Sequence, residues 1–380
     1  MPTLRHMIKQ EILQRGPMPF SRYMELCLYN PEHGYYSRNT EQFGKAGDFY
    51  TSSDVHAVFG RLLARQFDEM WRALGSPEHI DLVELGPGRG LFAQDVLDWS
   101  EKKFLDFFRA LRYVLVESSP ALRVRIKEAL RHHLESGKAE VTTLDTQDKL
   151  WAPNSPTIVF ANEFFDALPV EVLSAKGSLG IDERDGCFIE TWVQPSPEAL
   201  EFLDRYSVQP EPEERIEAPL AAQRSMDQIA VGIQRGFIVA IDYGYTRDEQ
   251  LAGRHRGTLK ALRQHSVSAN PYEAPGEQDI TADVNFTALA AAAEKRGMQT
   301  HKLVTQSQFL MGIGEANQFA DAFEDCRLPQ ERAKVALQLK HLVTPAGMGE
   351  SFQVMVASKG IEKERVAALS GLSFGLRASP

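Results

Sequence analysis

The segment at residues 81–93 constrains the fold of this chain more than any other feature, because its sequence, DLVELGPGRGLFA, passes from an apolar run through three alternate glycines into a helical pattern. Glycine permits the positive φ angles of a tight turn and lets a ligand lie against bare backbone. A helix that follows directly presents free N–H groups and the positive end of its dipole. The segment therefore predicts a strand, a ligand-binding loop at Gly86, Gly88 and Gly90, and a helix. The alternative is an incidental Gly-Pro turn.

Short apolar runs recur along the rest of the chain. They are Ile80–Leu85, Tyr113–Val116, Thr157–Ala161 and Gly236–Ile241, and longer amphipathic segments separate them. Each run is too short for a helix and rich in branched residues, which is typical of buried parallel strands. Acidic or amide residues follow three of them, as expected where strand ends face a ligand crevice. We therefore predict an α/β fold with a mostly parallel sheet flanked by helices, and residues 351–358 (SFQVMVAS) add a late antiparallel strand.

Composition and charge exclude several classes of protein. Apolar residues make up 43% and charged residues 25% of the 380 residues, which excludes a disordered or low-complexity chain. The 52 acidic and 42 basic residues give a net charge of -10, so we expect no nucleic-acid partner. The cysteines Cys27, Cys187 and Cys326 form no CxxC pair, and the histidines show no ligand spacing, so we expect no disulfide framework and no metal. Without a membrane-length apolar run or a signal or transit peptide, a cytoplasmic location is expected.

The N-terminal region predicts helices that precede the sheet. Apolar residues recur on one helical face over residues 4–15, and Gly16 with Pro17 ends this helix. A second helix is predicted from about residue 54 to 74, with Ser53 or Asp54 as its N-cap.

The stretch between the third and fourth predicted strands, residues 162–235, is longer than one crossover needs. Val170–Ser174 and Cys187–Val193 have the composition of hairpin strands, with turn residues between them, and prolines in an acidic stretch follow. We therefore predict an inserted β-hairpin and helical subdomain. The predicted parts are an N-terminal helical and lid extension at 1–60, a core at 61–175 and 236–360, the insertion at 176–235, and a flexible tail at 361–380.

The glycine spacing and Glu84 discriminate between cofactors. A dinucleotide fold uses G-x-G-x-x-G to hold a pyrophosphate, whereas here G-x-G-x-G follows an acid two residues before its first glycine. A carboxylate repels a phosphate but forms an ion-paired hydrogen bond with an α-amino group. S-adenosyl-L-methionine (SAM) carries such an amino group, so Glu84, Gly86, Gly88 and Gly90 predict a SAM site. This pattern disfavours the alternative, an NAD-linked oxidoreductase on a doubly wound sheet.

Polar residues follow the next two strands at the same predicted edge of the sheet. Glu117 stands where a carboxylate would bind the ribose hydroxyls, and we assign the adjacent Ser118 to the cofactor as well. After the third strand come Asn162, Glu163 and Asp166. In a methyl-transfer enzyme this position faces the reacting centre, so we predict both cofactor-binding and catalytic roles for Asn162 and Glu163, and a catalytic role for Asp166. The alternatives are solvated acids and an Asp166 that caps the next helix.

A histidine near the end of the fourth strand offers a further candidate base. Asp242 ends this strand and His265 lies in the loop beyond it. We predict a catalytic role for His265, with Asp242 as its partner in proton removal. The alternative is a solvated histidine in a polar loop.

Six separate motifs resemble those of one known family. They are NPxxGYY at residues 30–36, GDFYTS at 47–52, ELGPGRG at 84–90, ANEFFDALPV at 161–170, IDYG at 241–244 and DITADVNF at 279–286. Together they resemble the MidA-like family of SAM-dependent methyltransferases, which includes the arginine methyltransferase needed for mitochondrial complex I assembly. The resemblance covers residues 4–358. One departure is Leu262, where the family pattern leads us to expect Tyr or Phe.

The resemblance implies a Rossmann-like methyltransferase that binds SAM, releases S-adenosyl-L-homocysteine (SAH) and modifies a protein, with arginine nitrogen as the expected acceptor. It implies that Thr51 and Ser52 belong to a loop that closes over the cofactor, and that Glu163 and Asp166 face the reaction centre. Carboxylates suit an arginine acceptor, because a guanidinium with a pKa above about 12 must lose a proton as the methyl group arrives. A respiratory complex subunit is the partner that the resemblance suggests. A SAM-binding assembly factor with weak or no catalysis is the alternative.

Overall fold

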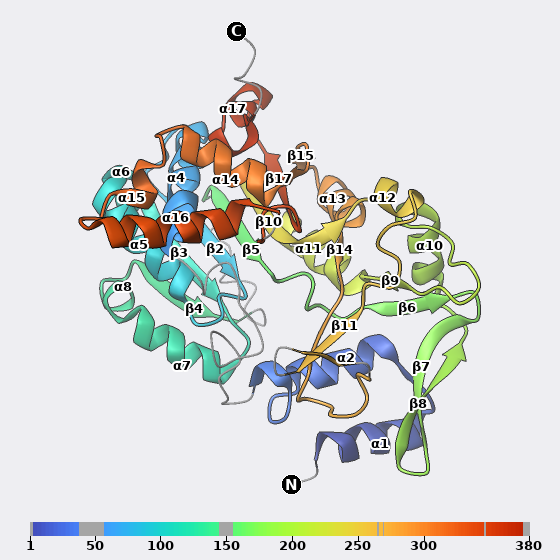
Figure 1. The fold of residues 1–380 in the computed structure, drawn as a ribbon. Coiled ribbons are helices and arrows are strands. Elements are labelled where there is room, and N and C mark those ends of the chain that lie inside the picture. Colours follow the sequence, from blue (N-terminus) through green and yellow to red (C-terminus); the bar gives the residue numbers. More distant parts are fainter. Residues whose placement is uncertain are drawn as a thin grey trace. The chain divides into compact units, whose positions relative to one another are not determined.

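The computed structural model describes residues 3–37, 57–143, 155–263, 266–268, 270–345 and 347–374. These residues form two compact units (Figure 1). Unit 1 comprises the described residues within 1–49, 164–228 and 244–292, and unit 2 comprises those within 50–163, 229–243 and 293–380.

Unit 2 is built around a mostly parallel sheet. Its strands are, in spatial order, β15 (Gln299–Thr300), β17 (Phe352–Lys359), β10 (Gly236–Tyr245), β5 (Thr157–Asn162), β2 (Ile80–Leu85), β3 (Leu111–Val116) and β4 (Ala139–Thr142). Neighbours from β10 to β4 are parallel, whereas β17 is antiparallel to β10, β15 and β16 (Val304–Thr305). The predicted α/β fold with a late antiparallel strand is therefore confirmed. Because β2 lies between β3 and β5, the chain reverses its direction of sheet growth beside β2, and ligands of such folds bind outside the carboxyl ends of the strands at this point.

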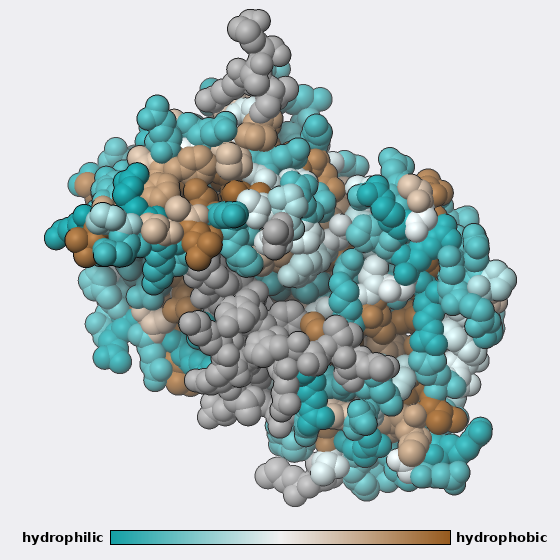
Figure 2. Space-filling model, viewed as in Figure 1, coloured by the Kyte–Doolittle hydropathy of each residue, from teal (hydrophilic) through white to brown (hydrophobic). Residues whose placement is uncertain are grey.

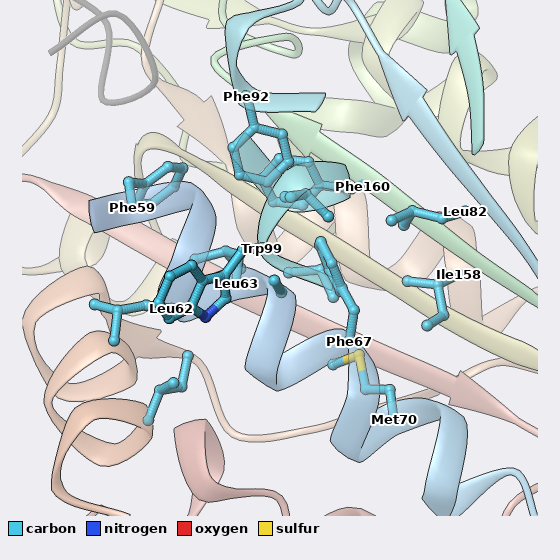
Figure 3. Close-up of a cluster of buried hydrophobic side chains, with 14 of the residues drawn as sticks. Phe59, Leu62, Leu63, Phe67, Met70, Leu82, Phe92, Trp99, Ile158 and Phe160 are labelled. Carbon is cyan, nitrogen blue, oxygen red and sulfur yellow. The ribbon is translucent and has the colours of Figure 1, made fainter. Parts of the chain in front are cut away.

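Helices surround this sheet and share one hydrophobic core with it. They are α4 (Ala57–Ala73), α5 (Leu91–Lys103), α6 (Leu105–Ala110), α7 (Pro120–Ala129), α8 (Arg131–Glu135), α14 (Gln306–Glu315), α15 (Ala320–Phe323) and α16 (Pro329–Val343). Figure 3 shows side chains of α4 and α5 meeting those of β2 and β5. The ring of Phe160 stacks on Phe92 at 4.5 Å and meets the edge of Phe67 at 5.6 Å. Close-packed aromatic pairs of this kind hold β5 and the helix after the glycine loop together.

The predicted helices at residues 4–15 and 54–74 are confirmed where the structure describes them. α1 spans Leu4–Arg15, and Gly16, at φ 83, ends it. α4 buries its apolar residues at steps of three and four, as the sequence pattern requires of an amphipathic helix. The predicted N-cap of α4, Ser53 or Asp54, lies outside the described residues.

Unit 1 contains two antiparallel sheets and its own helices. The first sheet has the order β1 (Met18–Pro19), β7 (Gly177–Arg184), β6 (Glu171–Ser174) and β9 (Ile216–Ala218), and β8 (Cys187–Val193) pairs with β7. The second has the order β12 (Ser266–Ser268), β11 (Lys260–Arg263) and β13 (Asp279–Thr281), and β14 (Val284–Asn285) pairs with the end of β10. The helices are α1, α2 (Phe20–Tyr29), the short η1 (Tyr35–Ser37), α10 (Pro197–Tyr206) and α12 (Arg247–Leu251), while α11 (Leu220–Gly232) and α13 (Phe286–Glu294) begin in unit 1.

The inserted region differs in detail from the predicted hairpin. The two predicted strands are present as β6 and β8, but β7 runs between them and pairs with both. β7 escapes prediction because its sequence, GSLGIDER, contains two glycines and three charged residues. Unit 1 also contains residues 244–292, which the prediction placed in the methyltransferase core. The division of the chain into four domains stays a prediction.

The predicted flexible tail is wrong for residues 361–374. Here α17 (Lys363–Ala367) and the short η3 (Ser370–Leu372) pack against α4. The Ser370 N–H donates to Glu69 Oε2 at 2.8 Å, and Val366 is fully buried. Single apolar residues in a polar segment give too weak a periodic signal to predict such packing.

Hydrophilic residues cover most of the described surface on the face shown in Figure 2. Figure 2 shows teal residues over most of the face in view, with brown residues gathered at the upper left, over α14 to α16. Leu328 and Leu337 are exposed near or on α16. Within the described part of the chain, no helix combines the length and the apolar character that crossing a bilayer requires.

Candidate cofactor site

The glycine loop joins β2 to α5 as the sequence predicts. All three of its glycines adopt left-handed backbone, with φ values of 64, 56 and 77 at Gly86, Gly88 and Gly90. The Gly86 N–H donates to Val116 O at 3.1 Å, which ties the loop to the end of β3. Gly90 is the N-cap of α5, and a Cβ on it would lie 3.3 Å from Cγ1 of Ile126. The loop therefore needs glycine both for its conformation and for the close approach of α7.

Glu84 lies on β2 just before this loop, and its carboxyl group is buried. Only 5% of the residue is exposed. The Tyr113 hydroxyl donates to its Oε2 at 2.8 Å. Burial raises the pKa of Glu84 to about 8, although the hydrogen bond from Tyr113 acts in the opposite direction. A cationic ligand next to this carboxyl group would lower its pKa and restore its charged form.

Glu117 follows β3 and is also buried. Its Oε1 accepts the Ser119 N–H at 2.8 Å. Burial raises its pKa to about 7, against the effect of hydrogen bonds from the backbone of Ser119, Gly88 and Ser118. The bond from Gly88 links this carboxylate directly to the glycine loop, while the Ser118 side chain is exposed.

Asn162 and Glu163 mark the end of β5. The Asn162 Nδ2 donates to Glu163 Oε1 at 3.1 Å, and the Glu163 N–H donates to Ile241 O at 2.9 Å on β10. Glu163 has a φ of 51, an unusual left-handed conformation for a residue other than glycine and a common feature of functional sites. The Asn162 Oδ1 is buried and accepts no hydrogen bond from the described residues. This oxygen therefore offers an acceptor to a bound group.

These groups of unit 2 fit SAM. Glu84 and Glu117 lie at the carboxyl ends of adjacent parallel strands, beside a loop whose three glycines have left-handed backbone. An α-amino cation and ribose hydroxyls are all donors, and both carboxylates and the orphaned Asn162 oxygen are acceptors. Among the residues that the structure describes, no group of three or more His, Cys, Asp and Glu side chains is placed to hold a metal ion.

Asp166 lies in unit 1, within a group of charged residues. Its backbone oxygen accepts the Ala282 N–H at 3.1 Å. The next residue along that segment, Asp283, accepts from Lys260 Nζ at 3.1 Å and contacts His255 Nδ1 at 3.3 Å. Burial raises the pKa of Asp166, and the negative charge of Asp283 raises it further. No helix follows Asp166 in the fully described stretch 155–174, where β6 is the next element, so the helix-capping alternative is wrong.

Three predicted site residues, Thr51, Ser52 and His265, lie outside the described residues. Their roles stay predictions. Asp242 is fully buried, and its Oδ1 accepts the Tyr243 N–H at 2.9 Å.

The structure also reveals residues that the sequence analysis missed. The His255 and Asp283 pair is one, although Asp283 belongs to a motif already noted. The Tyr113 hydroxyl is another, because a tyrosine in a buried strand resembles any other core aromatic until the register with β2 is known.

Curated relatives of this chain are named protein arginine methyltransferases. The "Protein arginine methyltransferase NDUFAF7 homolog, mitochondrial" of Drosophila melanogaster is 31% identical over 94% of this chain and 85% of its own length. The zebrafish (Danio rerio) "Protein arginine methyltransferase NDUFAF7, mitochondrial" is 30% identical over 92% of this chain and 85% of its own length.

The expected cytoplasmic location is contradicted by these relatives, which are mitochondrial proteins by name. The expectation failed because a cysteine pattern without disulfide spacing does not distinguish the cytoplasm from other reducing compartments.

A solved structure and a family model agree with the predicted cofactor. A Burkholderia thailandensis protein crystallised with SAH is 28% identical, with a TM-score of 0.81 over 97% of this chain and 94% of its own. A second structure from that organism, a native crystal structure of a COG1565 superfamily protein, has a TM-score of 0.80 at 29% identity, with the same coverage of both chains. The family model described as "Putative S-adenosyl-L-methionine-dependent methyltransferase" matches residues 62–304. The chain therefore belongs to this family of SAM-dependent methyltransferases, as the MidA-like motifs predicted, and SAM is its cofactor.

Proposed function

We propose that this enzyme methylates a nitrogen of arginine side chains in a protein substrate. The observation that carries the proposal is that two carboxylates follow β5 along the chain: Glu163, which is partly buried, and Asp166, which is buried. The relatives named above, at 30% and 31% identity over nearly the whole chain, are protein arginine methyltransferases by name.

Different residues bind different parts of SAM. We assign the α-amino group to Glu84, the ribose hydroxyls to Glu117, and a further polar contact to Asn162. The glycine loop admits the cofactor against its backbone. When bound, SAM supplies an electrophilic methyl group.

The acidic residues bind the acceptor and take up its proton. A guanidinium keeps its positive charge in proteins and presents donors in a planar fork that matches carboxylates. Glu163 and Asp166 would accept these donors, localise the charge on the far nitrogens and hold the proton that the reacting nitrogen loses. Asp166 suits a cation better than a neutral acceptor, because burial and the negative charge of Asp283 raise its pKa and a bound cation would restore its charged form.

Labelled methyl transfer tests the proposal. The purified protein would be incubated with labelled SAM and an extract of its own host that lacks this gene, followed by acid hydrolysis and amino-acid analysis. We expect label in methylated arginine within one protein band, which also identifies the substrate and shows whether it is a respiratory complex subunit. The Gly86→Val variant is the matched control. Label in another amino acid overturns the arginine assignment. No protein label, from a sample that binds SAM, overturns protein methylation and favours a SAM-binding assembly factor.

A further inference from the structure

The position of Tyr113 in the sheet places its hydroxyl on Glu84. In the β2–β3 pairing, Tyr113 is opposite Leu82 and Glu84 is opposite Leu115. Side chains two residues apart on a strand share a face of the sheet, so Tyr113 and Glu84 project from the same face. Their strands are hydrogen-bonded neighbours, and the phenol reaches across to the Oε2 atom of Glu84 at 2.8 Å.

The hydroxyl is unusual for its surroundings. Tyr113 is fully buried within the apolar core of unit 2, next to Leu82 and Leu115, which are also fully buried. Phenylalanine would supply the same packing, so the phenolic oxygen requires a polar partner to offset its burial. Glu84 is that partner, and within the described part of the chain no other hydrogen bond reaches the Glu84 carboxylate.

We propose that Tyr113 is a positioning residue for cofactor binding, whose hydroxyl holds Oε2 of Glu84 and leaves Oε1 for the α-amino group of SAM. This inference rests on the proposed role of Glu84. A carboxylate that is anchored through one oxygen loses less side-chain freedom when its other oxygen binds a ligand. Tyr113 itself touches no part of the cofactor in this scheme and acts through Glu84.

The test compares two ligands in one variant. Tyr113→Phe removes the hydroxyl and keeps the ring. Affinity would be measured by isothermal titration calorimetry for SAH and for the SAH analogue that lacks the α-amino group. We expect the affinity for SAH to fall about tenfold, as for loss of a hydrogen bond to a charged group, and the affinity for the analogue to change less than about twofold.

A matched control separates this effect from the loss of any buried hydroxyl. Tyr23 is also fully buried, and its hydroxyl donates to Pro271 O at 2.9 Å in unit 1. Tyr23→Phe should leave the affinity for both ligands unchanged. Thermal unfolding of each variant would show that it is folded at the titration temperature.

Three other outcomes would overturn the role proposed for Tyr113. Equal losses for SAH and the analogue in Tyr113→Phe would mean that the residue only shapes the pocket, and unchanged affinities would mean that its hydroxyl is irrelevant; both overturn the inference. If the wild-type protein binds the two ligands equally, the assignment of Glu84 is overturned and the inference fails with it. Methyl transfer to arginine is a separate measurement, so the proposed reaction can fail while this inference stands.

Discussion

We expect cofactor affinity to depend on pH, because Glu84, the proposed partner of the α-amino group of SAM, is a buried carboxyl group. Its pKa is raised to about 8, so the empty site holds it mostly protonated at neutral pH. Only the ionised form pairs with an α-amino cation. The ionised fraction of a group with a pKa of about 8 is about 1% at pH 6, about 9% at pH 7 and about 50% at pH 8. We therefore expect the affinity for SAH to rise about ninefold from pH 6 to pH 7, and about fivefold more by pH 8.

Calorimetric titration of SAH across this range measures the effect. Repeating it in buffers of different ionisation enthalpy also counts the protons released on binding, expected to approach one near pH 6. In Glu84→Gln, the rise in SAH affinity with pH that is due to Glu84 should vanish, and the affinity at pH 8 should fall. Because the pKa of Glu117 is raised to about 7, Glu117→Gln is the needed control, and it should retain most of the rise. An affinity for SAH that is flat across this range in the wild-type protein would refute the reasoning.

The same group has an opposite effect on the stability of the empty protein. A carboxyl whose pKa rises from 4.5 to about 8 on folding binds its proton more tightly in the folded state. Its stabilising contribution is therefore complete below about pH 4.5 and is lost as the pH rises through about 8. The stabilisation by SAH should consequently grow with pH over this window, which thermal unfolding with and without the ligand would reveal.

Three substitutions test separate parts of the structure. Gly86→Val should abolish SAH binding, because a branched residue is strained at a φ of 64 and fills space next to the loop backbone; a folded variant with retained affinity in calorimetry would show that the loop has been misassigned. Asp166→Asn should bind SAH within about threefold of wild type but lose transfer by about 100-fold or more, and parallel losses in titration and transfer assays would make it a structural or cofactor residue. Phe160→Ala should lower the free energy of unfolding by about 3–5 kcal/mol in urea titrations, since it removes a ring stacked on Phe92, and a loss below about 1 kcal/mol would contradict the packing.

The parts of this structure that follow from short-range signals were predictable. β2 begins and ends where the apolar run Ile80–Leu85 does. The loop after it was predictable because three alternate glycines directly after a buried strand are typical of a ligand-binding turn. β4 was missed, since its four residues bury only Ala139 fully and alternate weakly. The Tyr113 and Glu84 contact depends on the register of β2 with β3, and a shift of one residue would send the phenol to the other face of the sheet. Register is a tertiary property, so the sequence shows which residues carry the chemistry more readily than which residues hold them in place.

The buried carboxyls are better explained by ligand binding than by folding. A pKa displaced from 4.5 to about 8 corresponds to a cost of roughly 5 kcal/mol for charging Glu84 in the empty site, an upper figure in view of relaxation. Hydrophobic residues of similar size would avoid this cost and are often more stable in such positions. Glu84 and Glu117 nevertheless lie near the carboxyl ends of neighbouring strands, next to the glycine loop. A bound cation and hydroxyl donors would offset much of the free-energy cost of charging these buried carboxyl groups, which the surrounding apolar core cannot do. The burial of these two carboxyl groups therefore supports their proposed role in binding SAM.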